Sequence, residues 1–323
     1  MPWRKILRII YPVDIATLAY ILITWVYITI FGFKLTNASS HFAMRLGFVL
    51  VIAFLIYLDY TVPNRVIRFL RHFYPLALLG YFYPEIDFMN NIFFPNLDAQ
   101  VANLEVTIFG GHPSVWFSDF FHWKWFNDLM NLSYLSYYFL IFWVAYWVYK
   151  NLYEKFSLVI FIICMSFYIY YIIFIIFPVA GPQFYLPPPD NQIPDAYIFR
   201  EIMKFIHDMG EKPAAAFPSS HVGIMLILLY LSWRYAPKLL RFLIPIGILL
   251  ILSTVYIKAH YAIDVIAGFF SVPIVYWISS HSYATITNSM AEEMKIQLIY
   301  EKAKAFSNQI IKKIKKKDKE SNL

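Results

Sequence analysis

The sequence has little charge and almost no cysteine, and each shortage excludes a class of protein. Only 15% of its 323 residues are charged, whereas a soluble domain carries about 25%, so a soluble globular chain is excluded. Disorder is excluded because it requires low hydrophobicity and high charge, and 60% of these residues are hydrophobic. The single cysteine, Cys164, excludes an internal disulfide scaffold. A polytopic membrane protein remains. No small-residue cleavage site follows the first apolar run, so we expect no cleavable signal peptide.

Long apolar runs are what the sequence has in place of charge. About 20 mostly apolar residues are needed to cross roughly 30 Å of hydrocarbon, and seven runs approach that length. The positive-inside rule requires one more crossing, over His72–Tyr83, to keep all the basic clusters in the cytoplasm. We therefore predict an all-α, polytopic transmembrane helical bundle of about eight spans, with both termini cytoplasmic. The seven runs are Val13–Phe33, Phe42–Leu58, Leu129–Tyr149, Phe156–Phe177, Ser219–Trp233, Leu239–Ile257 and Ala262–Ser280.

This topology divides the chain into four regions. Residues 1–83 form N-terminal transmembrane helices, 84–128 an extracytoplasmic amphipathic and aromatic segment, 129–281 a transmembrane core and 282–323 a basic cytoplasmic tail. Residues 178–217 and 258–260 are expected on the same extracytoplasmic side as 84–127. The aromatic segment Trp116–Phe126 is either an interfacial anchor or the lid or wall of a lipid-entry groove.

The net charge of +7 comes mainly from the tail, where Ala291–Leu323 holds nine lysines and five acidic residues. A lysine cluster that follows membrane-spanning sequence is typical of a segment next to an anionic leaflet. We therefore expect the membrane bilayer, and not nucleic acid, beside this tail, which is either a solvated topogenic segment with no specific lipid partner or a segment that contacts anionic lipids.

A first polar cluster stands directly before an apolar run, at Phe217-Pro218-Ser219-Ser220-His221. Proline and serine both favour a helix start, and a helix N-terminus presents N–H groups that suit a phosphate. His221 would face such an anion. The alternative is that Pro218 and Ser219 only start the helix and His221 rests at the interface.

A second cluster runs from Ser253 to Asp264. His260 and Asp264 are four residues apart, so on a helix they share one face, and an aspartate beside a histidine fixes its tautomer and supports the imidazolium. That pairing suits a nucleophilic histidine. Two alternatives are a structural His–Asp hydrogen bond and a metal site completed by His221. We expect no metal and no cofactor, because no carboxylate or cysteine stands near His221 in the sequence.

Together the two clusters resemble the type-2 phosphatidic acid phosphatase superfamily, over about residues 129–280. The resemblance lies in Pro-Ser-Ser-His followed, one transmembrane hairpin later, by His-x-x-x-Asp. It implies a six-helix core and a metal-independent enzyme that cleaves or transfers lipid phosphate groups through a phosphohistidine. It also implies that His260, His221 and Asp264 are catalytic.

The sequence departs from the family pattern at the cationic positions. The family's motif arginine is Thr254 here, and its first motif is replaced by Phe177–Tyr185 (FPVAGPQFY), which contains Gln183. These features resemble the inositol phosphorylceramide synthase branch, whose members are phosphotransferases. Lys258 or Lys212 would then supply the positive charge, although a lysine lacks the bidentate fork of arginine. The predicted substrate-binding residues are Ser219, Ser220, Lys258, Lys212, Thr254 and Gln183.

The predicted function is therefore that of an integral-membrane lipid phosphatase or phosphotransferase. Its site would face the extracytoplasmic side, and the composition fits a bacterial inner membrane. The alternative is a non-catalytic transporter or scaffold with the same fold. The sequence does not indicate the lipid, the acceptor or the oligomeric state.

Overall fold

A computed structural model describes residues 9–35, 37–62, 64–193, 195–210 and 214–320. These residues form helices and connecting loops, with no strand among them. The basic N-terminal residues Arg4, Lys5 and Arg8 lie outside the described residues. The elements are α2 (Pro12–Phe31), the 3₁₀ turn η1 (Gly32–Lys34), α3 (Ala38–Thr61), α4 (Arg65–Met89), α5 (Asp98–Phe109), α6 (Pro113–Phe120), α7 (Lys124–Asn151), α8 (Tyr153–Ile176), α9 (Pro182–Tyr185), α10 (Phe199–Gly210), α11 (Ser220–Tyr235), α12 (Pro237–Tyr256) and α13 (Ala262–Glu320).

Six helical segments in the described part of the chain are long and apolar enough to cross a membrane, which confirms the polytopic helical bundle. They are α2 with η1, α3, α7, α8, α12 and α13 as far as Lys295. The other two predicted crossings also form helices. α4 spans about 37 Å at 1.5 Å per residue but carries several charged residues, and α11 spans only about 24 Å. Whether these two cross completely stays a prediction.

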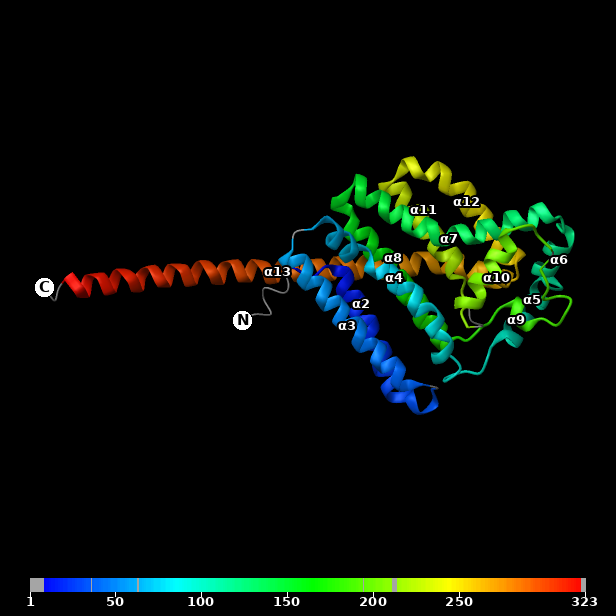
Figure 1. Ribbon diagram of the computed structural model, residues 1–323, viewed down its shortest axis with the longest axis horizontal. Coiled ribbons are helices and arrows are strands. Elements are labelled where there is room, and N and C mark those ends of the chain that lie inside the picture. The colour runs from blue at the N-terminus through cyan, green and yellow to red at the C-terminus, as the bar shows by residue number, and fades with distance from the viewer. Residues whose placement is uncertain (1–8, 36, 63, 194, 211–213, 321–323) are drawn as a thin grey trace.

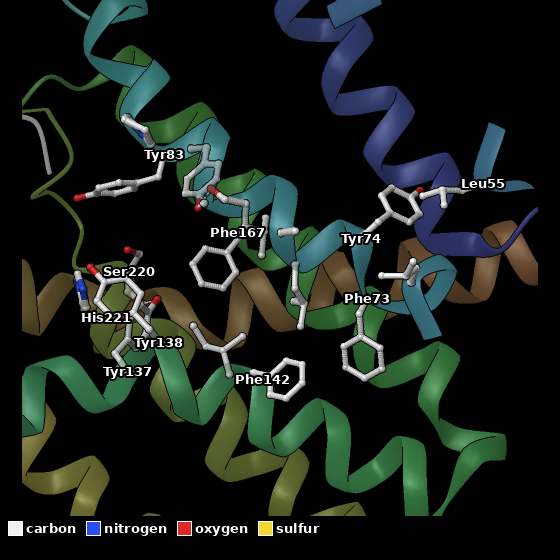
Figure 2. A pocket seen from close by; sticks show the side chains of 18 residues that line it. Leu55, Phe73, Tyr74, Tyr83, Tyr137, Tyr138, Phe142, Phe167, Ser220 and His221 are labelled. Atoms are coloured by element: carbon white, nitrogen blue, oxygen red, sulfur yellow. Dashed lines mark hydrogen bonds between the residues drawn. The ribbon is translucent and has the colours of Figure 1, made fainter. Parts of the chain in front are cut away.

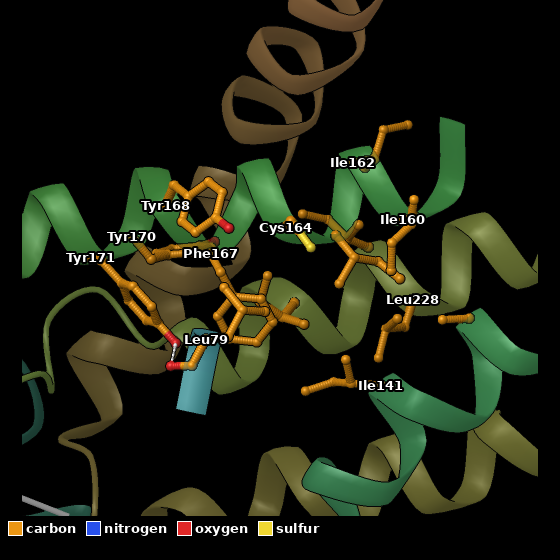
Figure 3. Packing of buried hydrophobic residues seen from close by; sticks show 14 of the residues in the cluster. Leu79, Ile141, Ile160, Ile162, Cys164, Phe167, Tyr168, Tyr170, Tyr171 and Leu228 are labelled. Atoms are coloured by element: carbon orange, nitrogen blue, oxygen red, sulfur yellow. Dashed lines mark hydrogen bonds between the residues drawn. The ribbon is translucent and has the colours of Figure 1, made fainter. Parts of the chain in front are cut away.

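Helix α8 is the centre of the bundle. Its sequence is apolar on every side, as expected for a helix with neighbours all round, and it packs against α2, α4, α7, α11 and α13. Figure 3 shows buried side chains of α8, Cys164 among them, in one cluster with Leu79 of α4, Ile141 of α7 and Leu228 of α11. The hydroxyl of Tyr171 donates a hydrogen bond of 3.1 Å to the carbonyl of Leu79. This contact fixes α8 beside α4.

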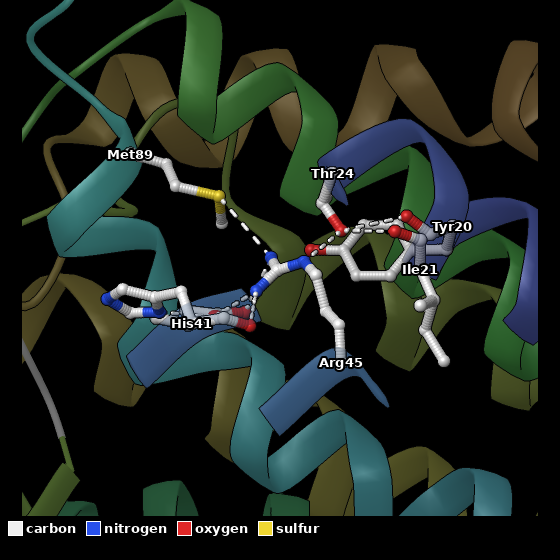
Figure 4. Close-up of polar contacts among 7 residues, drawn as sticks. Tyr20, Ile21, Thr24, His41, Arg45 and Met89 are labelled. Carbon is white, nitrogen blue, oxygen red and sulfur yellow. Dashed lines mark hydrogen bonds and ion pairs between the residues drawn. The ribbon is translucent and has the colours of Figure 1, made fainter. Parts of the chain in front are cut away.

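Buried ion pairs join the three N-terminal helices. The guanidinium of Arg45 on α3 binds both carboxylate oxygens of Glu85 on α4, at 2.7 and 3.1 Å, and Nδ1 of His41 lies 2.6 Å from the same carboxylate (Figure 4). On α2, Asp14 binds Arg71 of α4 through both oxygens. Charges are expensive at membrane depth unless they are paired, so these pairs specify how α2, α3 and α4 assemble.

The short helices α5, α6, α9 and α10 gather at one end of the molecule, and the projecting part of α13 extends from the other end (Figure 1). This places the segments that were predicted to be extracytoplasmic together. Helix α13 does not stop near Ser280: it continues to Glu320 as one helix of 59 residues. The basic tail is therefore a rod-like extension of a membrane-spanning helix.

Candidate active site

The first motif lies where it was predicted, at the N-terminus of α11. Ser219 is the N-cap, and its hydroxyl oxygen accepts a hydrogen bond of 3.4 Å from the backbone N–H of Val222. Ser220 and His221 are the first two residues of the helix. The first N–H groups of a helix have no carbonyl partner within it. The motif therefore directs backbone N–H groups and an imidazole to the same end of the bundle.

The second motif is not one continuous helix. Helix α12 ends at Tyr256, and α13 begins at Ala262. Lys258 takes the left-handed conformation with φ at +62°, and the N–H of His260 donates a hydrogen bond of 3.0 Å to the carbonyl of Thr254. The assumption that His260 and Asp264 lie on one helix is thus wrong, because only Asp264 belongs to α13. His260 stands in the turn that leads into α13.

The two histidine rings meet. Nδ1 of His221 and Nε2 of His260 are 3.1 Å apart. Both residues are buried: His221 is 5% exposed and His260 is 2% exposed. Nδ1 of His260 lies 2.8 Å from the carbonyl oxygen of Ala216. Because a carbonyl can only accept, this nitrogen carries the ring proton. In the neutral ring Nε2 then holds the lone pair, and it faces His221.

Asp264 completes the cluster, although its role in the geometry differs from the prediction. Its Oδ2 lies 3.5 Å from Nδ1 of His260 and accepts a hydrogen bond of 2.8 Å from the N–H of Tyr261. The closer acceptor for His260 is the Ala216 carbonyl, so that carbonyl, and not Asp264, determines the tautomer. Asp264 places a negative charge beside the ring. Its Oδ1 is buried and accepts no hydrogen bond from the described residues.

Two glycines allow the motif loops to approach each other. A Cβ at Gly268 of α13 would lie 2.6 Å from the backbone oxygen of Ser219, and one at Gly181 would lie 2.6 Å from that of Ala259. Gly181 also has φ at +100°, a region that L-residues with a side chain rarely adopt. Larger residues here would push apart the loops that carry His221 and His260.

Two buried acids of α5, which the sequence interpretation missed, hold these loops together. Asp98 accepts hydrogen bonds from the N–H groups of Ala180 and Gly181, at 2.6 and 2.8 Å, and from the hydroxyl of Tyr261, at 3.0 Å. Burial and the neighbouring Asp98 raise the pKa of Tyr261 well above its usual 10.0, so the phenol stays protonated as the donor. Asp98 thereby joins the α8–α9 loop to the second motif.

Glu105, seven residues further along α5, also binds a segment that is distant in the sequence. Its Oε1 accepts a hydrogen bond of 2.6 Å from the N–H of Ala262, the first residue of α13, and its Oε2 lies 2.9 Å from Nδ1 of His112. Burial raises the pKa of Glu105, and the contacts with His112 and Ala262 offset this only in part. Asp98 and Glu105 are seven residues apart, close to two helical turns, so they share a face. This seven-residue spacing is the sequence signal that could have indicated that the two acids act together.

The other predicted substrate-binding residues do not gather at one point as the two histidines do. The ammonium of Lys258 is buried and donates a hydrogen bond to the carbonyl of Gln192. Burial lowers its pKa, while Asp119 and Asp190 oppose the shift. The Thr254 hydroxyl donates to the carbonyl of Ile251 in its own helix, at 2.7 Å. Gln183 is half-buried beside the turn, and its N–H donates to the carbonyl of Lys258. Lys212 lies outside the described residues.

A large cavity opens beside Ser220 and His221 of the first motif. It has a volume of about 920 Å³, and Ser220 and His221 form one end of it (Figure 2). None of its lining residues comes from the aromatic segment Trp116–Phe126, so that segment is not a wall of this cavity. Within the segment, Phe117 and Phe126 pack on Tyr256 of α12, while Trp116 and Trp125 are exposed.

Among the described residues, no group of three or more histidine, cysteine, aspartate or glutamate side chains has an arrangement that could hold a metal ion. A family model described as the PAP2 superfamily matches residues 99–278, which is more than half of the chain. This region begins in α5 and includes both histidine motifs. No curated protein and no solved structure matches the chain.

Proposed function

The chain belongs to the PAP2 superfamily, and on that premise we propose that it is an integral-membrane lipid phosphatase or phosphotransferase that works through a phosphohistidine. The observation that carries the proposal is the contact of 3.1 Å between Nε2 of His260 and Nδ1 of His221. With the proton of His260 held on Nδ1 by the Ala216 carbonyl, Nε2 is a nucleophile aimed at a second imidazole. A nucleophile oriented beside an acid–base group is the arrangement that covalent catalysis requires.

In the first step, the phosphate of a lipid enters between the two rings, and the hydrogen bond that joins them breaks. The Nε2 lone pair of His260 attacks phosphorus and forms an N–P bond. The bond from phosphorus to the leaving oxygen breaks, and its electron pair stays on that oxygen. His221, carrying both ring protons, gives one to the leaving oxygen. Asp264 stabilises the positive charge that develops on the His260 ring.

The second step uses the same groups in reverse. Neutral His221 removes a proton from an acceptor hydroxyl, whose oxygen attacks phosphorus, and the N–P bond breaks to restore His260. Water as acceptor gives hydrolysis, and an alcohol gives transfer. The burial of both rings restricts water and supports transfer, as in an inositol phosphorylceramide synthase-like headgroup transferase. The backbone N–H groups at the start of α11 would bind the phosphoryl oxygens, assisted by Lys258 once it releases the Gln192 carbonyl.

We further propose that this chemistry takes place on the extracytoplasmic face of the membrane. The composition favours the bacterial inner membrane as its location. The short helices that surround the motifs lie at the end of the molecule opposite the projecting C-terminal helix. The lysine-rich tail supports a cytoplasmic position for that helix by the positive-inside rule. The site would then receive lipids whose phosphates lie at the outer interface.

The test is to incubate the purified protein with radiolabelled lipid phosphates, in EDTA, with and without alcohol acceptors. We expect labelled phosphate or a labelled transfer product, and an acid-labile label on the wild-type protein. His260→Ala should form neither label nor product, and His221→Ala should lose turnover. His281→Ala, an exposed histidine that stacks on Trp277 far along α13, is the matched control. Full activity in His260→Ala or His221→Ala would exclude the mechanism. Absence of activity in the wild type would favour the transporter or scaffold alternative.

A further inference from the structure

The cavity beside His221 extends far from the proposed chemistry, along α4. Its lining reaches from Ser220 and His221 to Leu70 and Phe73. In Figure 2, Tyr83, Ser220 and His221 gather near one end, and Phe73, Tyr74 and Leu55 lie at the other. The α4 residues that line it, from Leu70 to Pro84, span about 21 Å along the helix axis. The cavity is thus deep enough to follow much of a lipid chain across a hydrocarbon layer of roughly 30 Å.

The lining favours a hydrocarbon occupant. Apart from Ser220 and His221 at one end, it consists of aliphatic and aromatic side chains, with a few tyrosine hydroxyls, and no lysine, arginine, aspartate or glutamate is among its residues. Its volume of about 920 Å³ is near the upper limit of common ligand pockets, about 1,000 Å³. A ligand that fills it would be long and apolar, with its polar group at the histidine.

One wall of the cavity comes from outside the region that the family model matches. The matched residues are 99–278, whereas α4 covers Arg65–Met89. α4 supplies half of the lining, including the small residues Ala77 and Gly80, and α7 contributes Tyr138, Ile141 and Phe142. An added Cβ at Gly80 would meet no atom within 4 Å. The space in front of Gly80 is therefore open, and α4 lies in the part of the chain that the family model does not cover.

We propose that this cavity binds the acyl chain of the phosphate-bearing lipid, and that Gly80 and Ala77 determine which chains fit. The inference rests on the proposed function, because it places the phosphate at His260 and His221. The occupant follows from continuity: a lipid whose phosphate reaches His221 has its chain directed into the cavity that begins there. Gly80 is nearer to His221 along α4 than Ala77 is, by about 4.5 Å. A side chain added at Gly80 therefore shortens the usable cavity more than one added at Ala77.

The experiment compares wild type, Gly80→Leu and Ala77→Leu on phosphatidic acids of graded acyl length and on p-nitrophenyl phosphate, which has no chain. The ratio of kcat/KM for the longest to the shortest lipid should fall at least tenfold in Gly80→Leu, since one methylene group in an apolar pocket is worth about 10- to 200-fold. Ala77→Leu should move the optimum to a chain length between those of Gly80→Leu and wild type. The rates on p-nitrophenyl phosphate should not change. Gly47→Leu is the matched control, because Gly47 lies on α3, does not line the cavity and has room for a Cβ.

A second measurement separates this inference from the proposed function. A phosphatidic acid with a photoreactive group in its acyl chain is crosslinked to the His260→Ala protein, and the labelled peptides are identified. We expect labelling of α4 and α7 that is lost in the Gly80→Leu, His260→Ala double variant. An inactive wild type with this labelling pattern would refute the catalytic proposal alone. An unchanged chain-length profile in Gly80→Leu, or labelling that avoids α4, would overturn the acyl-chain site.

Discussion

The backbone N–H of Ser219 donates a hydrogen bond of 2.9 Å to the backbone carbonyl of Asp264. This bond joins the N-terminus of α11 directly to the first turn of α13, so the two motifs are connected through main-chain atoms and not only through their side chains. His221 and His260 can meet because this connection holds the helix starts together. The same connection makes the site sensitive to substitutions that leave every proposed catalytic residue in place.

Gly268→Ala should therefore reduce activity strongly. The new Cβ would lie 2.6 Å from the Ser219 oxygen, and since that oxygen is backbone, α11 and α13 must move apart. A displacement of about 1 Å at a reacting group costs about 100-fold in rate, so we expect a loss of at least that size in kcat. Gly47→Ala, with no neighbour within 4 Å, should retain wild-type activity. Equal kcat values for Gly268→Ala and Gly47→Ala would show that the close packing of α13 against α11 does not align the motifs.

Asp264→Asn tests the charge beside the nucleophile. The amide can still accept the hydrogen bond from the N–H of Tyr261, but the negative charge 3.5 Å from Nδ1 of His260 is lost. Without it the phosphohistidine cation is less stable, and we expect kcat to fall by about 10²–10⁴-fold with a much smaller change in KM. Asp195→Asn, at an exposed carboxylate on the loop before α10, is the control. If kcat were unaffected in Asp264→Asn, Asp264 would have only a structural role.

Sequence reasoning located the two histidines and Asp264 because short motifs encode them, and the apolar runs predicted the long helices. It wrongly placed His260 on the same helix as Asp264, because the left-handed conformation of Lys258 follows the end of α12 and such a conformation is usually signalled by glycine. It missed Asp98 and Glu105 for a different reason. Their partners are mainly backbone N–H groups of segments more than 80 residues away. Their seven-residue spacing places both acids on one helix face, but no local pattern indicates which distant segment pairs with that face.

Glu105→Gln should change how stability depends on pH. Burial raises the pKa of Glu105 above its usual 4.5, so the folded protein holds this proton more tightly than the unfolded chain does. The associated stabilisation is fully present below about pH 4.5 and is lost as the pH rises through the folded pKa. Glutamine does not titrate. The melting temperature of wild type relative to the variant should thus decrease from pH 4.5 upwards, as measured in detergent, and a pH-independent difference would contradict the prediction.

Glu85→Ala should destabilise the N-terminal unit. It leaves Arg45, which is almost fully buried, without its carboxylate partner, and breaking a buried pair in this way costs about 3–5 kcal/mol. The free energy of unfolding can be measured by SDS titration in mixed micelles. The double variant Glu85→Ala, Arg45→Leu removes the isolated charge, so it should recover much of the loss. A double variant as unstable as the single one would mean that packing, and not the charge, causes the effect.

The position of Cys164 in the middle of α8, with no solvent exposure, has a practical consequence. It is the only thiol in the chain, and reagents in water or detergent have no path to it while the bundle is folded. A cysteine introduced at any exposed position is then the only group that a maleimide or spin label modifies. The unmodified sequence is thus already suited to spectroscopic distance measurements and to mapping which face of the membrane each loop occupies.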